Sequence, residues 1–122
     1  MKRILICDDE PHIVEGLRHL LRGADRTIAV ARSGQEALQS IEASVPDLLV
    51  LDIMMPQMSG LEVLARLRDE NATKDLPIII LTAKGEAQDA SMAQEVWRAT
   101  VMAKPFEPQK LRELVTTTLE NG

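Results

Sequence analysis

The sequence predicts an α/β fold in which helices cover both faces of a parallel sheet. Short runs with strand character alternate along the chain with longer stretches of helical period. Two of the short runs, 48–51 and 78–81, are continuously apolar, as is typical of strands buried on both faces of a parallel sheet. The 122 residues, 45% of them hydrophobic, suffice for one core, so we expect a single domain over residues 1–122.

Ten elements follow from this alternation. The strands are expected at residues 3–7, 27–31, 47–51, 77–81 and 99–103. Pro11 suits the first turn of a helix whose apolar residues recur on one face. Two capping boxes mark further helix starts, namely Ser33 with Glu36 and Ser59 with Glu62. The last two helices are expected at about 86–97 and about 108–119.

Right-handed crossovers between these strands give a doubly wound sheet of order 2-1-3-4-5, a flavodoxin-like three-layer sandwich. Such a sheet carries its site at the carboxyl ends of strands 1 and 3, where the strand order reverses. The side chains expected at the strand ends are Asp8, Asp9, Asp52, Thr82 and Lys104. Because neighbouring strands lie about 4.8 Å apart, Asp9 and Asp52 are expected to converge on one ion, with Lys104 reaching back toward them.

Three carboxylates at one edge repel one another unless a cation lies among them, and an all-oxygen set suits Mg²⁺. Mg²⁺ and Lys104 would offset the charge of an incoming phosphoryl group while Asp52 attacks as the nucleophile and forms an acyl phosphate. The Thr82 hydroxyl would donate to a phosphoryl oxygen. Each residue also has an ordinary explanation as a helix cap, turn residue, strand end or solvated charge. Their joint position at the ends of four strands favours the functional interpretation.

Four segments resemble the receiver domains of two-component response regulators, and the sequence is similar to the single-domain chemotaxis regulators of that family. The segments are Ile4-Leu5-Ile6-Cys7-Asp8-Asp9-Glu10, Asp47-Leu48-Leu49-Val50-Leu51-Asp52-Ile53-Met54-Met55-Pro56 followed by Met58-Ser59-Gly60, Ile80-Leu81-Thr82-Ala83-Lys84, and Lys104-Pro105-Phe106. The resemblance covers essentially the whole chain. It implies a phosphorylation-dependent signalling switch rather than an enzyme.

The resemblance also implies roles for individual residues. Asp52 would be the phosphoacceptor, beside a Mg²⁺ ion bound directly by Asp9 and the Met54 carbonyl. Asp8 would bind the same ion through water. Lys104 would pair with the phosphoryl group, and the bond from Lys104 to the following proline is expected to be cis.

The resemblance further implies that Thr82 carries the switch hydroxyl, with which the conformational response to phosphorylation would begin. The phosphoryl donor would be a sensor histidine kinase or a histidine phosphotransfer protein, and the recipient of the signal a downstream target protein or effector domain. Phosphorylation would alter the face formed by the fourth helix, the fifth strand and the fifth helix. Because the chain ends just after the last predicted helix, we expect no effector domain within these residues.

Two positions depart from the family pattern. Val101 stands where the family usually carries Tyr or Phe, whose ring moves inward as the switch threonine moves to the phosphate. We therefore expect a smaller response than usual. Trp97 and Arg98 stand where Gly-Ala is usual. The Trp97 side chain either packs into the junction before the fifth strand or forms part of an altered partner surface.

Composition and motifs disfavour other functions. The net charge of −5 argues against nonspecific binding to nucleic acid or to an anionic membrane, and no apolar run is long enough for a membrane span. Cys7 is the only cysteine, so a reducing, cytoplasmic setting is expected. A haloacid-dehalogenase-like phosphatase would need an Asp at Met54, and a flavin carrier would need an aromatic pair. A pseudo-receiver that is never phosphorylated is a further alternative, favoured only by Val101 and Trp97.

Overall fold

The computed structural model describes residues 1–83 and 85–121, in which five strands alternate with five helices. In chain order the elements are β1 (Lys2–Cys7), α1 (Pro11–Leu21), β2 (Arg26–Ala31), α2 (Gly34–Ala43), β3 (Leu48–Asp52), α3 (Gly60–Arg68), β4 (Ile78–Thr82), α4 (Ala87–Glu95), β5 (Thr100–Ala103) and α5 (Pro108–Asn121). The α/β class predicted from the sequence is confirmed. The observed bounds lie within two residues of the predicted ones.

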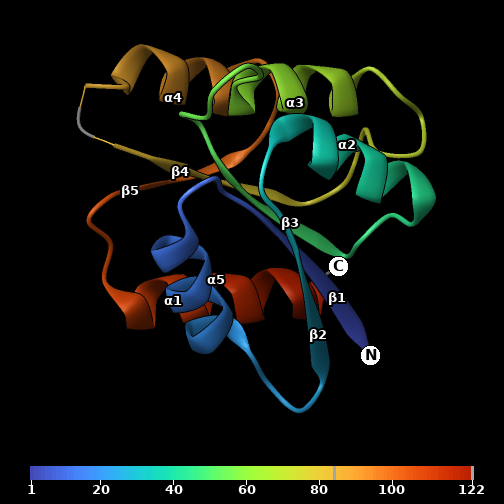
Figure 1. Ribbon diagram of the computed structural model, residues 1–122, viewed down its shortest axis with the longest axis vertical. Helices are drawn as coiled ribbons and strands as arrows, with labels where there is room; N and C mark the ends of the chain where they lie inside the picture. Colours follow the sequence, from blue (N-terminus) through green and yellow to red (C-terminus); the bar gives the residue numbers. More distant parts are fainter. Residues whose placement is uncertain (84, 122) are drawn as a thin grey trace.

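All strand pairs are parallel, and their order is β2-β1-β3-β4-β5, as predicted. Helices α1 and α5 cover one face of the sheet, and α2, α3 and α4 cover the other (Figure 1). Strands β1 and β3 are neighbours, and Cys7 near the end of one pairs with Leu51 near the end of the other. The residues that follow Cys7 and Leu51 therefore meet at the switch point of the sheet.

The sheet separates two apolar layers, with β3 and β4 buried between them. Every residue of these two strands is buried. Leu49 and Leu51 of β3 belong to the layer under α2 and α3, whereas Leu48 and Val50 belong to the layer under α1 and α5. Because helices cover both faces, both sets of side chains must be apolar, which explains the continuous hydrophobic runs in the sequence.

Local sequence sets the helix starts as predicted. Ser33 precedes α2 and Ser59 precedes α3, and each hydroxyl accepts the backbone N–H three residues later, at 3.1 and 3.3 Å. Pro11 is the first residue of α1. The short segment that carries Asp8 and Asp9 is therefore held between the end of β1 and a fixed helix start.

Strands β3 and β4 each extend one residue further than predicted, to Asp52 and Thr82. Pairing continues at this point because the Ile53 N–H still donates to the Leu81 carbonyl at 3.3 Å. Asp52 and Thr82 therefore belong to the strands themselves rather than to the loops after them. Their backbones are fixed by the sheet.

Helix α4 ends two residues earlier than predicted, at Glu95. Arg98 then adopts the left-handed region, with φ of 57°, and its guanidinium donates to the Lys74 carbonyl at 2.9 Å. This turn ends the helix and leads the chain into β5. Among the residues that the structure describes, no helix is both long and apolar enough to span a membrane.

Candidate functional site

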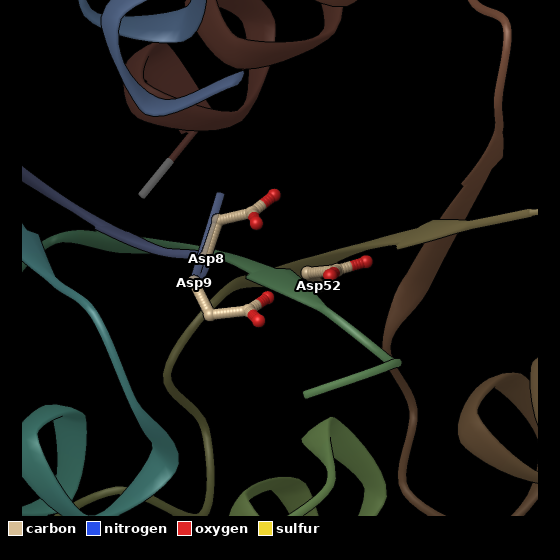
Figure 2. Close-up of side chains that lie close together, drawn as sticks. All are labelled: Asp8, Asp9 and Asp52. Atoms are coloured by element: carbon tan, nitrogen blue, oxygen red, sulfur yellow. The ribbon is translucent and has the colours of Figure 1, made fainter. Parts of the chain in front are cut away.

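Three carboxylates meet at the carboxyl edge of the sheet, as predicted. Asp8 and Asp9 follow β1, and Asp52 is the last residue of β3 (Figure 2). One carboxylate oxygen of each residue lies within 4.8 Å of the corresponding oxygens of the other two. The neighbouring positions of β1 and β3 in the sheet bring these residues together although they are far apart in the sequence.

The carboxylates of Asp8 and Asp52 are buried, which disfavours their charged forms. Their residues are only 1% and 4% exposed. Burial raises the pKa of Asp52 to about 6, against the opposing hydrogen bond from Lys104 and with a further contribution from Asp8. Burial also raises the pKa of Asp8. Two buried carboxylates so close together require a compensating positive charge.

The two carboxylate oxygens of Asp8 have different surroundings. Within the described part of the chain, Oδ2 of Asp8 is buried and has no hydrogen-bond partner, while its Oδ1 accepts the Glu10 N–H at 3.0 Å. A buried, unpartnered carboxylate oxygen is unfavourable in a folded protein unless an ion or water satisfies it. The three carboxylates offer only oxygen ligands, which are the donors that Mg²⁺ prefers.

The carboxyl edge with Asp8, Asp9 and Asp52 is called the acidic edge below. Lys104 reaches the acidic edge from just after the end of β5, as predicted. Its Nζ donates to Oδ1 of Asp52 at 3.0 Å. Although burial lowers the pKa of Lys104, the contact with Asp52 more than offsets this, and the pKa is raised overall. The backbone N–H of Lys104 donates to the Thr82 carbonyl at 2.6 Å, and the Lys104–Pro105 bond is cis, as expected from the resemblance.

Thr82 ends β4 and is buried, with Ala103 of β5 opposite it. Val101 pairs with Ile80 of β4 and is partly buried against the layer under α2, α3 and α4. Trp97 is partly buried against the same layer. Its side chain thus packs into the junction before β5, which is the first of the two arrangements considered for it.

The loop after Asp52 brings Met54 to the surface, with 64% of the residue exposed. This loop is held by a hydrogen bond from the Gly60 N–H to the Ile53 carbonyl, 2.8 Å long. A Cβ atom at Gly60 would overlap the Asp52 carbonyl oxygen and lie 2.9 Å from the Cα of Ile53. Gly60 therefore positions the site. From the sequence, Gly60 was identified only as part of a motif, because a close approach of two backbone segments leaves no signal in residue periodicity.

A second residue that sequence reasoning missed is Glu86, which was expected only at the start of a helix. Its carboxylate accepts a hydrogen bond from the Ala83 N–H, beside the end of β4. Its charge also contributes to raising the pKa of Asp52, after burial and Asp8. The residue lies 34 positions from Asp52 in the sequence, so only the fold shows that the two are near each other.

The fold and the acidic edge define a doubly wound α/β domain with a polar site at its switch point. Residues 4–116 match the family model of the response regulator receiver domain, and the chain belongs to this family. Receiver domains act as signalling switches of two-component systems and are generally not enzymes. The response regulators to which the chain is homologous partner with sensor kinases and effector domains.

Individual relatives agree with this assignment. The chain is 38% identical over 121 residues to the alkaline phosphatase synthesis transcriptional regulatory protein PhoP of Bacillus subtilis. This match covers 99% of the chain and 50% of the relative. It is 41% identical over 110 residues to the phosphate regulon transcriptional regulatory protein PhoB of Pseudomonas aeruginosa, covering 90% of the chain and 48% of the relative. The chain thus spans about half the length of the curated relatives it matches.

The solved structures show the same fold. A putative response regulator from Chloroflexus aurantiacus superposes with a TM-score of 0.89 at 39% identity, and the match covers 98% of both chains. The chemotaxis protein CheY4 of Vibrio cholerae superposes with a TM-score of 0.86 at 27% identity, covering 97% of this chain and 98% of that one. The flavodoxin-like receiver fold predicted from the sequence is confirmed.

Proposed function

We propose that Asp52 accepts a phosphoryl group from a phosphohistidine of a partner and that residues 1–122 form one phosphoacceptor domain. The observation that carries the proposal is the setting of the Asp52 carboxylate. It is buried at the carboxyl edge, 3.0 Å from Nζ of Lys104, with the carboxylates of Asp8 and Asp9 within 4.8 Å. Membership of the receiver family supports this role, and the donor would be a sensor histidine kinase or a histidine phosphotransfer protein.

In the proposed reaction an oxygen of the Asp52 carboxylate attacks phosphorus. The new O–P bond forms as the P–N bond to the partner's imidazole breaks, and the product on this chain is an acyl phosphate. The imidazole leaves with the electron pair of the broken bond and takes up a proton. Lys104 already lies beside the attacking group, so its ammonium can follow the negative charge onto the phosphoryl oxygens.

The acidic edge fits a Mg²⁺ ion. Asp8, Asp9 and Asp52 would hold it together with the Met54 carbonyl, a set made only of oxygen donors. The buried oxygen of Asp8 that has no hydrogen-bond partner in the described chain supports this assignment. When bound, the ion supplies positive charge that offsets the charge on the phosphoryl oxygens.

The response is proposed to start at Thr82, whose buried hydroxyl would donate to a phosphoryl oxygen. The face built from α4, β5 and α5 would then change its affinity for a target protein or effector domain. A shift of the conformational population from 1:99 to 99:1 requires about 5.5 kcal/mol of coupling. Val101 offers no ring that can move inward with Thr82, so we expect phosphorylation to change the conformational population less than it does in receivers with an aromatic residue there.

Phosphorylation by acetyl phosphate tests the proposal directly. The chain is incubated with acetyl phosphate and Mg²⁺ and its intact mass is measured. We expect the mass of one added phosphoryl group on the parent chain and none on Asp52→Asn. The matched control is Asp75→Asn, which changes an exposed carboxylate distant from the acidic edge and should be phosphorylated like the parent. A parent chain that gains no phosphoryl mass would contradict the proposal.

The alternative is a pseudo-receiver that binds its partner without phosphorylation, for which the departures at Val101 and Trp97 are the specific observations. Beryllofluoride, which mimics the phosphoryl group, separates the two functions. Amide chemical shifts on α4, β5 and α5 should change on adding beryllofluoride with Mg²⁺ if the chain is a switch. Shift changes as large as those of receivers that carry the aromatic residue would refute the smaller response expected here.

A further inference from the structure

The backbone N–H of Ala83 lies where the ladder between β3 and β4 ends. The Leu81 carbonyl faces β3 and accepts from Ile53 at 3.3 Å, whereas the Thr82 carbonyl faces β5. This alternation turns the next N–H, that of Ala83, toward β3. Its partner in a continued ladder would be the Ile53 carbonyl, but that carbonyl accepts from Gly60 at 2.8 Å instead. The Ala83 N–H is thus released from the sheet on the side of the phosphoacceptor strand.

The Ala83 N–H donates instead to a carboxylate of the same chain. Oε1 of Glu86 accepts from the Ala83 N–H. Oε2 of the same carboxylate is buried and has no hydrogen-bond partner among the described residues. The proximity of Glu86 to the acidic edge is also visible in its contribution to the raised pKa of Asp52, which follows that of burial and of Asp8. The acidic edge therefore holds a fourth carboxylate nearby.

A simpler explanation is that Glu86 only caps the turn before α4. Its backbone N–H donates to the Ala83 carbonyl at 3.2 Å, and the Ala90 N–H donates to its carbonyl at 2.9 Å. A glutamate that reaches back three residues to a backbone N–H is the second half of a capping box. Capping accounts for the contact of Oε1, but it gives no reason to bury the other oxygen close to like charges, where burial is unfavourable.

We propose that Glu86 is a resident competitor of the phosphoryl group: its carboxylate occupies the Ala83 N–H that a phosphoryl oxygen on Asp52 would otherwise accept from. This inference rests on the proposed function of Asp52. The phosphoryl group adds negative charge beside Glu86, so the two anions cannot share one donor and the Glu86 side chain must leave. Because Glu86 immediately precedes α4, its release reaches the start of that helix. Glu86 is in this sense a positioning residue that couples the site to α4 where Val101 offers no ring.

The test is a titration of the full chain with beryllofluoride in the presence of Mg²⁺, read by the amide signals of the protein. The main variant is Glu86→Gln, which keeps the shape of the side chain and an oxygen that can accept from Ala83 but removes the charge. Asp89→Asn is the matched control, because Asp89 is the acidic residue in the first turn of α4. We expect Glu86→Gln to bind beryllofluoride about tenfold more tightly than the parent, which corresponds to about 1.4 kcal/mol. The control should change the affinity less than twofold.

A second variant and a second signal keep the test decisive. Glu86→Ala removes the competing oxygen altogether and should also bind beryllofluoride more tightly, even if it lowers the stability of the turn. In the parent the Ala83 amide signal should shift on saturation, because its acceptor changes from a carboxylate to the phosphoryl mimic. Equal or weaker binding by both variants overturns the role of Glu86 and leaves the role of Asp52 intact. A parent that neither binds beryllofluoride nor gains phosphoryl mass overturns the proposed function itself.

Discussion

Gly60 offers the sharpest test of how the fold positions the acidic edge. The Gly60→Ala change adds one methyl group at the first residue of α3. The added Cβ would overlap the carbonyl oxygen of Asp52 and lie 2.9 Å from the Cα of Ile53, whereas ordinary contacts of this kind are 3.4–4 Å. Its neighbours are backbone atoms at the end of β3 and not the flexible end of a side chain. The loop or the strand end must therefore move.

The cost can be worked from these contacts. Overpacking against rigid neighbours typically costs about 1–3 kcal/mol, and weakening the hydrogen bond from Gly60 to Ile53 costs about 1 kcal/mol more. Replacing glycine by alanine in a helix returns about 0.5–1 kcal/mol. We expect a net loss of about 2 kcal/mol in the free energy of unfolding. For a chain of 122 residues this lowers Tm by about 8 °C.

The assay is thermal and urea unfolding followed by circular dichroism, together with the rate of phosphorylation by acetyl phosphate. Gly16→Ala is the matched control, because a Cβ at this exposed position in α1 meets no atom within 4 Å. It should leave phosphorylation unchanged and raise stability by about 0.5–1 kcal/mol. Gly60→Ala should lower stability and slow phosphorylation together, since Asp52 shifts with the loop. A Gly60→Ala protein as stable as the parent would refute the close approach seen here.

Three further predictions concern residues that take no part in the proposed chemistry. Gln57 has a φ of 70°, so Gln57→Gly should raise the free energy of unfolding by about 0.5–1 kcal/mol, seen as a higher urea midpoint with an unchanged slope. Burial and the nearby carboxylates raise the pKa of Cys7 to about 12, so at neutral pH this thiol should react with a disulfide reagent only as fast as the chain unfolds; rapid reaction of the folded chain would contradict this. Arg68 donates to three backbone carbonyls, at 2.7, 3.0 and 2.8 Å, so Arg68→Met should lower the free energy of unfolding by at least about 2 kcal/mol. Arg66 is exposed on the same helix, and Arg66→Met should leave the free energy of unfolding almost unchanged when both variants are unfolded in urea.

Much of the fold follows from sequence patterns that have a direct physical cause. The apolar runs of β3 and β4 reflect burial on both faces, and the serines before α2 and α3 make the predicted caps. The end of α4 was predicted less well, because a left-handed φ at Arg98 ends the segment and arginine gives no signal for that conformation. Tertiary contacts hold it instead, since its guanidinium donates to the Lys74 carbonyl.

Some residues of the candidate site were predictable from the sequence and others were not. Asp8, Asp9 and Asp52 were predictable because the carboxyl ends of adjacent parallel strands must meet at one edge. Gly60 and Glu86 were not, because their importance depends on which backbone groups the ladder leaves unpaired at its end. Such groups become visible only when each hydrogen bond of the strand ends is traced.

The charges at the edge suggest an order for the events that we propose. Three carboxylates lie together with Glu86 nearby, and Nζ of Lys104 donates a hydrogen bond to one of them. A phosphoryl group would add further negative charge to an edge that already raises the pKa of Asp52. We therefore expect the divalent cation to bind before the phosphoryl group, and Glu86 to leave as the phosphoryl group arrives. On this view the excess of acidic residues both creates the cation requirement and drives the departure of Glu86 from the start of α4.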